Sequence, residues 1–177
     1  AVLLTLLGVV AETLWVEQAR KREIQSMFGA YVDPEVVAQL VRNPDSIELG
    51  GERREATVFF SDLAGFTDLS EKLPPEQMVE VVNAYLEQTS ECLHKHGAYV
   101  DKYIGDAVMA VFGVPLPLPD HAIAGCKSAL EAHRAIETIN EKYAAKVGVK
   151  LKVRIGLNTG EMIVGNLGSS RKKNYTV

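Results

Sequence analysis

The order of the predicted elements indicates an α/β (α+β) domain with a ferredoxin-like split βαβ fold. The run of β-formers at 56–60 predicts a short buried strand, and 150–157 alternates between apolar and basic residues as a half-buried strand does. Between them, apolar residues from Met78 to Leu93, Tyr85 among them, recur at helical spacing. A predicted hairpin and a second helix complete the set, so the order is strand, helix, strand, strand, helix, strand.

Residues 1–16 are interpreted as the end of a transmembrane helix. The segment from Ala1 to Ala11 is almost wholly apolar, but it is too short to cross a bilayer, which needs about 20 residues. Trp15 suits the membrane interface, and Arg20 to Arg22 form a basic flank on the cytoplasmic side. A buried soluble helix is the alternative. We expect a protein of the cell membrane with its later residues in the cytoplasm, joined by a helical linker at 17–50.

The region from residue 51 to 177 is predicted to hold the folded domain. A long helix should begin at Pro74-Pro75 and end at Gly97, a left-handed cap that follows the cationic residues 94–96. This position already explains the two histidines there, so zinc is not favoured. The runs 98–104 and 107–112 should form a hairpin around Gly105-Asp106, because glycine in first place suits a type II′ turn.

The second half of this domain is predicted to contain a helix, two further strand-like runs and a final strand. The helix should be capped near Asp120, and the run 150–157 should turn at 158–161 into 162–167, with a last strand near Asn174. The residues expected to face inward on the helix are Ala122, Cys126, Ala129, His133 and Ile136.

The composition gives no sign of nucleic-acid binding. The formal net charge of the 177 residues is −4, and the basic runs are short. The two cysteines, Cys92 and Cys126, lie in apolar helical patterns, which favours buried reduced thiols.

Two acidic residues follow corresponding strands. Asp62 ends the first strand, and Asp106 lies in the hairpin after the second. Because a helical crossover makes these two strands run parallel, their carboxyl ends should lie at one edge of the sheet. Paired carboxylates suit hard divalent cations that bridge to phosphates, although each acid could instead simply close a turn.

Two further features fit phosphate binding at that edge. The turn Gly65-Phe66-Thr67 leads toward a helix, so its backbone N–H groups could contact phosphate oxygens. Arg154 stands on the polar face of its strand, where a guanidinium could neutralise phosphate charge. An ordinary solvated charge, alternating with Lys150 and Lys152, is an equally good explanation of Arg154.

Two ordered motifs carry a resemblance to a known family. F-x-D-x-x-G-F-T at Phe60–Thr67 and D-K-x-I-G-D-A at Asp101–Ala107 resemble the class III nucleotidyl cyclase catalytic domain of the bacterial membrane-anchored type. The likeness runs from about Arg53 to Val177. It implies an enzyme of signal transduction that converts ATP into cyclic AMP and pyrophosphate, with sites at a homodimer interface.

The resemblance also implies roles for individual residues. Asp62 and Asp106, with the carbonyl of Leu63, would hold two Mg²⁺ (or Mn²⁺) ions, and Arg154 would contact the triphosphate. Lys102 would read the purine and favours ATP over GTP, because guanylate cyclases usually have an acid there. Thr176 would be its partner, at a position where adenylate cyclases usually have Asp.

The resemblance leaves part of the catalytic set outside the sequence. The Asn and Arg that stabilise the transition state in this family would lie beyond Val177, so residues 1–177 alone are expected to be inactive. The alternatives are a guanylate cyclase and an inert dimerising module that senses nucleotides.

Overall fold

The structural description covers nearly all of the chain from residue 50 onward. A computed structural model describes residues 15–16, 50–148, 150–169 and 172–177, and the chain divides into two compact units, Ala1–Ser46 and Ile47–Val177. Residues 15 and 16 are helical, while the rest of the predicted membrane segment and nearly all of the linker at 17–50 lie outside the described residues. Within the described ranges, no helix is long and apolar enough to cross a membrane. The predicted domain boundaries stay predictions.

A five-stranded antiparallel sheet is the centre of the second unit. Its order is β2-β3-β1-β4-β5. The strands are β1 (Gly50–Leu63), β2 (Ala98–Ile104), β3 (Ala107–Phe112), β4 (Val153–Gly168) and β5 (Lys173–Thr176). Since β3 pairs antiparallel with both β1 and β2, the latter two run in the same direction with β3 between them. The predicted split βαβ fold class is therefore confirmed.

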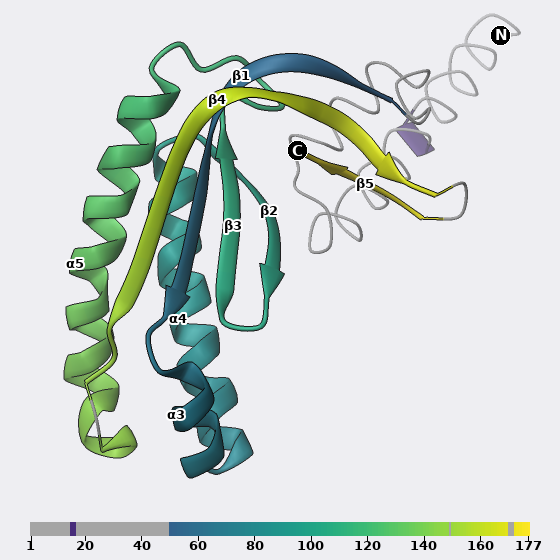
Figure 1. The fold of residues 1–177 in the computed structure, drawn as a ribbon. Helices are drawn as coiled ribbons and strands as arrows, with labels where there is room; N and C mark the ends of the chain where they lie inside the picture. Colours follow the sequence, from purple (N-terminus) through teal and green to yellow (C-terminus); the bar gives the residue numbers. More distant parts are fainter. Residues whose placement is uncertain (1–14, 17–49, 149, 170–171) are drawn as a thin grey trace, which may run out of the picture. The chain divides into compact units, whose positions relative to one another are not determined.

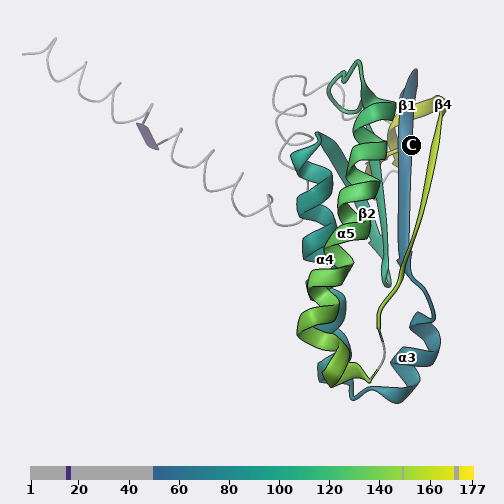
Figure 2. The ribbon, with the colours of Figure 1, turned by 90° about the vertical axis from the view of Figure 1, so that its left-hand side faces the viewer.

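Two long helices cover one face of this sheet. Figure 2 shows the sheet nearly edge-on, with α4 (Pro75–Lys95) and α5 (His121–Val147) on the same side. The short helix α3 (Phe66–Lys72) connects β1 to α4. The core lies between helices and sheet, and its fully buried large side chains include Phe59, Leu63, Val81, Tyr85, Leu93, Val108 and Phe112.

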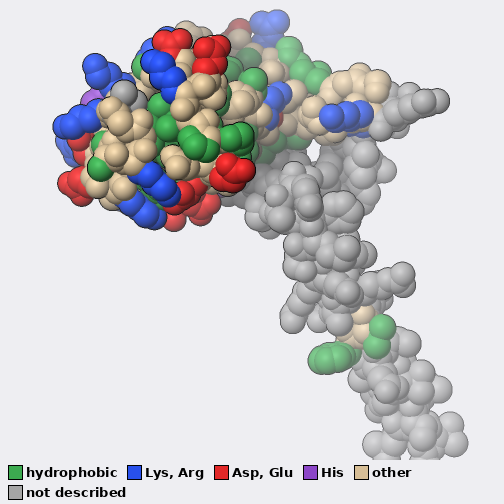
Figure 3. Space-filling model, turned by 90° about the horizontal axis from the view of Figure 1, so that it is seen from below, with side chains coloured by type: hydrophobic (Ala, Val, Ile, Leu, Met, Phe, Trp, Pro, Cys, Tyr) green, Lys and Arg blue, Asp and Glu red, His purple; other side chains and the backbone are tan. Residues whose placement is uncertain are grey.

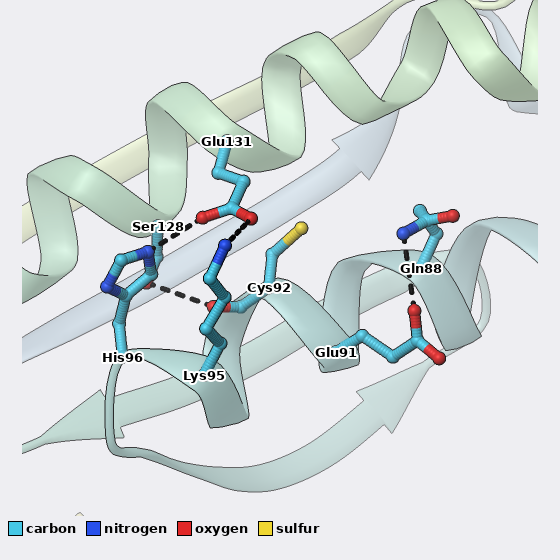
Figure 4. A network of polar contacts seen from close by, with 7 residues as sticks. All are labelled: Gln88, Glu91, Cys92, Lys95, His96, Ser128 and Glu131. Atoms are coloured by element: carbon cyan, nitrogen blue, oxygen red, sulfur yellow. Dashed lines mark hydrogen bonds and ion pairs between the residues drawn. The ribbon is translucent and has the colours of Figure 1, made fainter.

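The first long helix follows the sequence prediction closely. Pro75 is the first residue of α4, where its missing N–H costs nothing, and Gly97 has a left-handed φ of 77° just after the helix. In Figure 4, the carboxylate of Glu131 on α5 lies between Lys95 Nζ, at 2.5 Å, and His96 Nε2, at 2.8 Å. The C-terminal end of α4 is thus joined to α5 by hydrogen bonds.

The inward face predicted for α5 is wrong by about one residue. The buried positions are Gly125, Ser128, Ala132, Ile136, Ile139, Asn140, Tyr143 and Val147, so Ala122, Cys126 and His133 are exposed, Ala129 is half-buried and only Ile136 is fully buried as expected. The helix approaches the sheet through its smallest residues. A Cβ on Gly125 would lie 3.2 Å from the Thr57 methyl group. Cys126 is therefore an exposed thiol, whereas Cys92 is buried as predicted, and both are free.

The turn predicted at 158–161 is also wrong. Residues 158 to 161 pair with residues 55 to 58 of β1 and lie within one continuous 16-residue strand. The reason is that β1 has 14 residues, whereas the sequence predicted five at 56–60. The longer β1 provides a pairing partner for each of residues 158 to 161.

The long β1–β4 ladder arches, as Figure 1 shows, so that the two edges of the sheet approach each other. The Tyr99 hydroxyl on β2 donates a hydrogen bond to the Tyr175 carbonyl on β5 over 2.8 Å. The two rings meet edge to face at 5.7 Å. Near the far end of the ladder, a Cβ on Gly165 would lie 2.2 Å from the Gly50 carbonyl oxygen, which explains a glycine at this position.

Asn140 provides a test of how α5 is joined to the sheet. Its buried amide donates to the Leu151 carbonyl at 3.0 Å and accepts from the Leu151 N–H at 2.7 Å. Asn140→Leu leaves both backbone groups without partners, so we expect the free energy of unfolding to fall by about 2 to 4 kcal/mol. Urea denaturation measures this loss. Glu137→Ala, on the exposed face of the same helix, is the control; equal effects of the two substitutions would contradict the assignment.

Candidate active site

The two acids predicted from the sequence lie together at one end of the sheet, where β1 and β2 finish. Asp62 is the next-to-last residue of β1, and Asp106 is in the two-residue turn between β2 and β3. Gly105 opens this turn with a φ of 65°, a left-handed conformation that glycine adopts without strain. Asp106 Oδ2 accepts the N–H of Leu63 at 2.9 Å. This hydrogen bond brings the hairpin against the end of β1.

Arg154 is bound to one of the two acids. It is the cross-strand neighbour of Asp62, and its Nε and Nη2 donate to the two carboxylate oxygens at 2.8 and 2.6 Å. These hydrogen bonds, together with the negative charge of Asp62, raise the pKa of Arg154. The sequence did not show this contact. In this structure the guanidinium neutralises the carboxylate, in a pair whose side chains are partly exposed to solvent.

An open pocket of about 300 Å³ lies beside this pair. Its lining comes from β1, β4 and the start of β3: Phe60, Ser61, Asp62, Ala107, Arg154, Ile155 and Gly156. The pocket is therefore made by the same strand ends that carry the acids, and the side chains of Asp62 and Arg154 are its charged groups.

The donor set fits a hard divalent cation. Asp62 and Asp106 offer carboxylate oxygens from adjacent strand ends, and the Leu63 carbonyl belongs to the same strand end. Among the described residues, no three His, Cys, Asp or Glu side chains form a metal cluster. Two carboxylates are nevertheless enough for Mg²⁺, which keeps several water ligands and takes others from substrate phosphates. The guanidinium already held by Asp62 shows that this edge stabilises positive charge.

A buried hydroxyl pair lies beneath the acids. The Tyr85 hydroxyl on α4 donates to Ser61 Oγ at 2.7 Å, and both residues are almost fully buried. Burial raises the pKa of Tyr85 to about 12, and the charges of Asp106 and Asp62 contribute to the rise. The spacing of apolar residues along the helix did not reveal this link to the strand that ends near Asp62.

The turn after β1 begins a helix rather than a loop. Gly65 has a φ of 74° and precedes the first residue of α3, Phe66. The first N–H groups of any helix lack partners within it, so the backbone at Phe66 and Thr67 keeps donors available. Gly65 and Thr67 are exposed and Phe66 is half-buried. Their contact with phosphate stays a prediction.

Lys102 and Thr176 meet where the edges of the sheet approach each other. Lys102 Nζ on β2 lies 3.1 Å from Thr176 Oγ1 on β5. A residue that the sequence analysis did not single out completes this cluster: Asp101 Oδ2 accepts the Thr176 hydroxyl and lies 3.4 Å from Lys102 Nζ. Asp101 was part of the quoted motif, but nothing in the sequence indicated the direction of its side chain.

Comparison with known proteins relates this geometry to nucleotide cyclases. Residues 51–177 match the family described as the adenylate and guanylate cyclase catalytic domain. Adenylate cyclase 1 of Rhizobium meliloti is 30% identical over 160 residues, which cover 89% of this chain and 24% of that protein. An uncharacterised protein of Mycobacterium tuberculosis is 34% identical over 163 residues, covering 89% of this chain and 28% of that protein. The chain thus spans about a quarter of the length of these relatives.

Two solved structures are similar in both sequence and fold. The guanylyl cyclase Cya2 is 36% identical with a TM-score of 0.67, over 72% of this chain and 65% of that one. The adenylyl cyclase CyaB from P. aeruginosa is also 36% identical, with a TM-score of 0.69, over 72% of this chain and 67% of that one.

The raised pKa of Tyr85 predicts how stability depends on pH. Because the folded protein holds this proton more tightly than the unfolded chain, the contribution is fully present below pH 10 and is lost as the pH rises toward about 12. Wild type should lose roughly 2 to 3 kcal/mol of unfolding free energy relative to Tyr85→Phe across that window. Urea denaturation of both proteins at a series of pH values measures the difference. A difference that stays constant with pH would contradict the assignment.

Proposed function

The chain belongs to the adenylate and guanylate cyclase catalytic domain family, and we propose that the full-length protein is an adenylate cyclase. It would convert ATP into 3′,5′-cyclic AMP and pyrophosphate. The 3′-oxygen of the ribose forms a bond to the α-phosphorus and gives up its proton, while the bond from that phosphorus to the pyrophosphate oxygen breaks. The observation that carries the choice of ATP is the contact of Lys102 with Thr176 at the base-reading positions.

Asp62, Asp106 and the Leu63 carbonyl would hold the cations of this reaction. Bound Mg²⁺ or Mn²⁺ would favour ionisation of the attacking hydroxyl and neutralise charge on the phosphates. The Leu63 N–H has a separate role in the chain itself, because it fixes Asp106 Oδ2 and so orients the other carboxylate oxygen. Gly65, Phe66 and Thr67 would add backbone donors for the phosphates.

Arg154 would change partners when nucleotide binds. It now holds both oxygens of Asp62, which are the oxygens that a cation would need. A triphosphate beside the pocket offers the guanidinium another planar set of oxygen acceptors. We infer that Arg154 keeps Asp62 neutralised in the empty state and binds phosphate in the loaded state.

Guanylate cyclase is the second candidate. It is favoured by the similarity to Cya2, whose identity to this chain equals that of CyaB. Lys102 argues against it, because the resemblance places an acid there in guanylate cyclases. ATP is therefore the proposed substrate.

We propose that two copies of the chain share each site. The Lys102 ammonium is directed to β5, whereas the Asp106 carboxylate, four residues later, is directed to β1. One nucleotide would have to bridge both directions within a single chain, whereas a two-fold dimer lets each hairpin serve two sites. The hairpin also carries exposed apolar side chains, with Tyr103 at 51% and Ile104 at 55%. Figure 3, which views the molecule from below, shows apolar side chains among charged ones on this face.

Attachment to the cell membrane is also a proposal. It is supported by the apolar segment at 1–11 and the basic residues 20–22, which follow the positive-inside rule. The catalytic domain would then act on ATP in the cytoplasm and signal through cyclic AMP.

The metal assignment is tested with single substitutions in the full-length protein. Asp62→Ala and Asp106→Ala should each lower cyclase activity by about a thousandfold or more, because each removes a cation ligand. Electron paramagnetic resonance of free Mn²⁺ should show weaker binding by both variants, with unchanged thermal unfolding. Asp120→Ala, an exposed acid without a capping hydrogen bond, is the matched control. Near-normal Mn²⁺ binding by either variant would refute the assignment.

Site sharing is tested by complementation. Full-length Asp62→Ala and Lys102→Ala proteins should each be nearly inactive, and mixing them should restore activity up to about a quarter of wild type. Statistical exchange gives about half heterodimers, and each of these holds one intact site of two. Differently tagged subunits show by co-purification that heterodimers form. If they form and the mixture is no more active than its components, the shared-site model is wrong.

A further inference from the structure

The position of Asp101 depends on a β-bulge. Val100 pairs with Ala110 and Lys102 with Met109, so Asp101 is an extra residue on β2. In a regular strand, neighbouring side chains point to opposite faces. The bulge breaks this alternation. Asp101 and Lys102 therefore both reach Thr176.

The carboxylate of Asp101 determines where the Thr176 proton lies. A threonine hydroxyl has one proton and accepts with its lone pairs, and it normally rotates to suit its neighbours. Here the Thr176 hydroxyl donates to Asp101 Oδ2, whereas the Val177 carbonyl is 3.5 Å away, at the limit of a hydrogen bond. Lys102 can only donate, so it takes one lone pair of Thr176 Oγ1. Toward any further ligand, Thr176 is therefore an acceptor only.

Stability does not explain this carboxylate. The Asp101 side chain is only 1% exposed, and its Oδ1 has no hydrogen-bond partner among the residues that the structure describes. A buried carboxylate oxygen without a partner costs free energy, and such groups call for a functional explanation.

The resulting pattern of donor and acceptor matches one purine edge. Adenine presents an acceptor at N1 and a donor at its 6-amino group, whereas guanine and hypoxanthine present a 6-oxo acceptor and an N1–H donor. Lys102 supplies a donor, and Thr176 with its proton held by Asp101 supplies an acceptor. A freely rotating hydroxyl would accept from a 6-amino group or donate to a 6-oxo group equally well.

We infer that Asp101 is a positioning residue that fixes Thr176 as an acceptor and so makes the site selective for 6-aminopurine nucleotides. This inference rests on the proposed cyclase function and names the origin of its base selectivity. Adenylate cyclases usually have a carboxylate at the position of Thr176. In this chain Asp101 on β2 supplies the carboxylate, and it would act on the base through Thr176.

The test compares ATP with inosine triphosphate (ITP), which differs from ATP at the 6-position and N1 and has no 2-amino group. In the full-length protein, Asp101→Asn should lower the ratio of kcat/KM for ATP to that for ITP by about tenfold or more, because an amide can either donate to Thr176 or accept from it. A structural role alone would lower both values together. Asp120→Asn, at an exposed site, should leave the ratio unchanged.

A second variant moves the carboxylate from position 101 to position 176. Asp101→Asn combined with Thr176→Asp places an acceptor-only group at the base position, so the ratio should return to within about threefold of wild type. An unchanged ratio in Asp101→Asn would overturn the inference while leaving the adenylate cyclase proposal intact. A wild-type protein that prefers GTP to ATP would overturn both.

A measurement on the wild-type protein covers the case in which Asp101→Asn does not fold. Purine riboside triphosphate lacks the 6-substituent, so it leaves Thr176 unpaired, whereas ITP places an acceptor against it. We expect ATP to react best, then purine riboside triphosphate, then ITP. If ITP reacts faster than purine riboside triphosphate, Thr176 is free to donate and the inference is wrong.

Discussion

The arched ladder of β1 and β4 is the constraint on which both ends of the candidate site depend. The two strands pair from Gly50 with Asn166 to Leu63 with Val153 without a break in register. One end of the ladder places Asp62 against Arg154, and near the other end Gly165 pairs with Thr176. Because the ladder arches, the β2–β3 hairpin contacts both of these regions, through Asp106 to Leu63 and through Lys102 to Thr176. A single hairpin is thus held between the proposed cation site and the proposed base-reading site.

Charge is balanced differently at these two edges. At the first, the partly exposed Asp62 is paired with a largely exposed Arg154, so a divalent cation can replace the guanidinium without leaving a buried charge unpaired. At the second, the Asp101 carboxylate is buried and its neighbours, Lys102 and Thr176, hold only one of its oxygens. Replacing it would leave Lys102 with less compensation. The first edge is suited to exchange of ligands, and the second is suited to a fixed arrangement.

The sequence was sufficient for the parts of the fold that local patterns determine. The β-formers before Asp62, the proline start of α4 and the glycine turn before Asp106 each specify their own conformation, and together they predict two strands that run in the same direction. Prediction from the sequence failed where contacts between distant segments determine the conformation. The pairing of 158–161 with β1 removed an apparent turn, and the close approach of Gly125 to the sheet rotated the buried face of α5. The partners of Arg154 and Asp101 could not be predicted either, since one depends on strand register and the other on a bulge.

The bulge at Asp101 shows how a change in backbone geometry can replace a change in residue type. A hydroxyl is a poor discriminator between a 6-amino and a 6-oxo group, because it can donate or accept. A carboxylate discriminates, because it can only accept. If Thr176 is the base-reading residue, as we propose, the chain places the poorer discriminator against the base. The bulge then brings the buried Asp101 carboxylate behind Thr176, so that the hydroxyl can accept a hydrogen bond from the base but not donate one. The base selectivity that we propose for this domain is therefore a property of three residues on two strands, which meet because the sheet is curved.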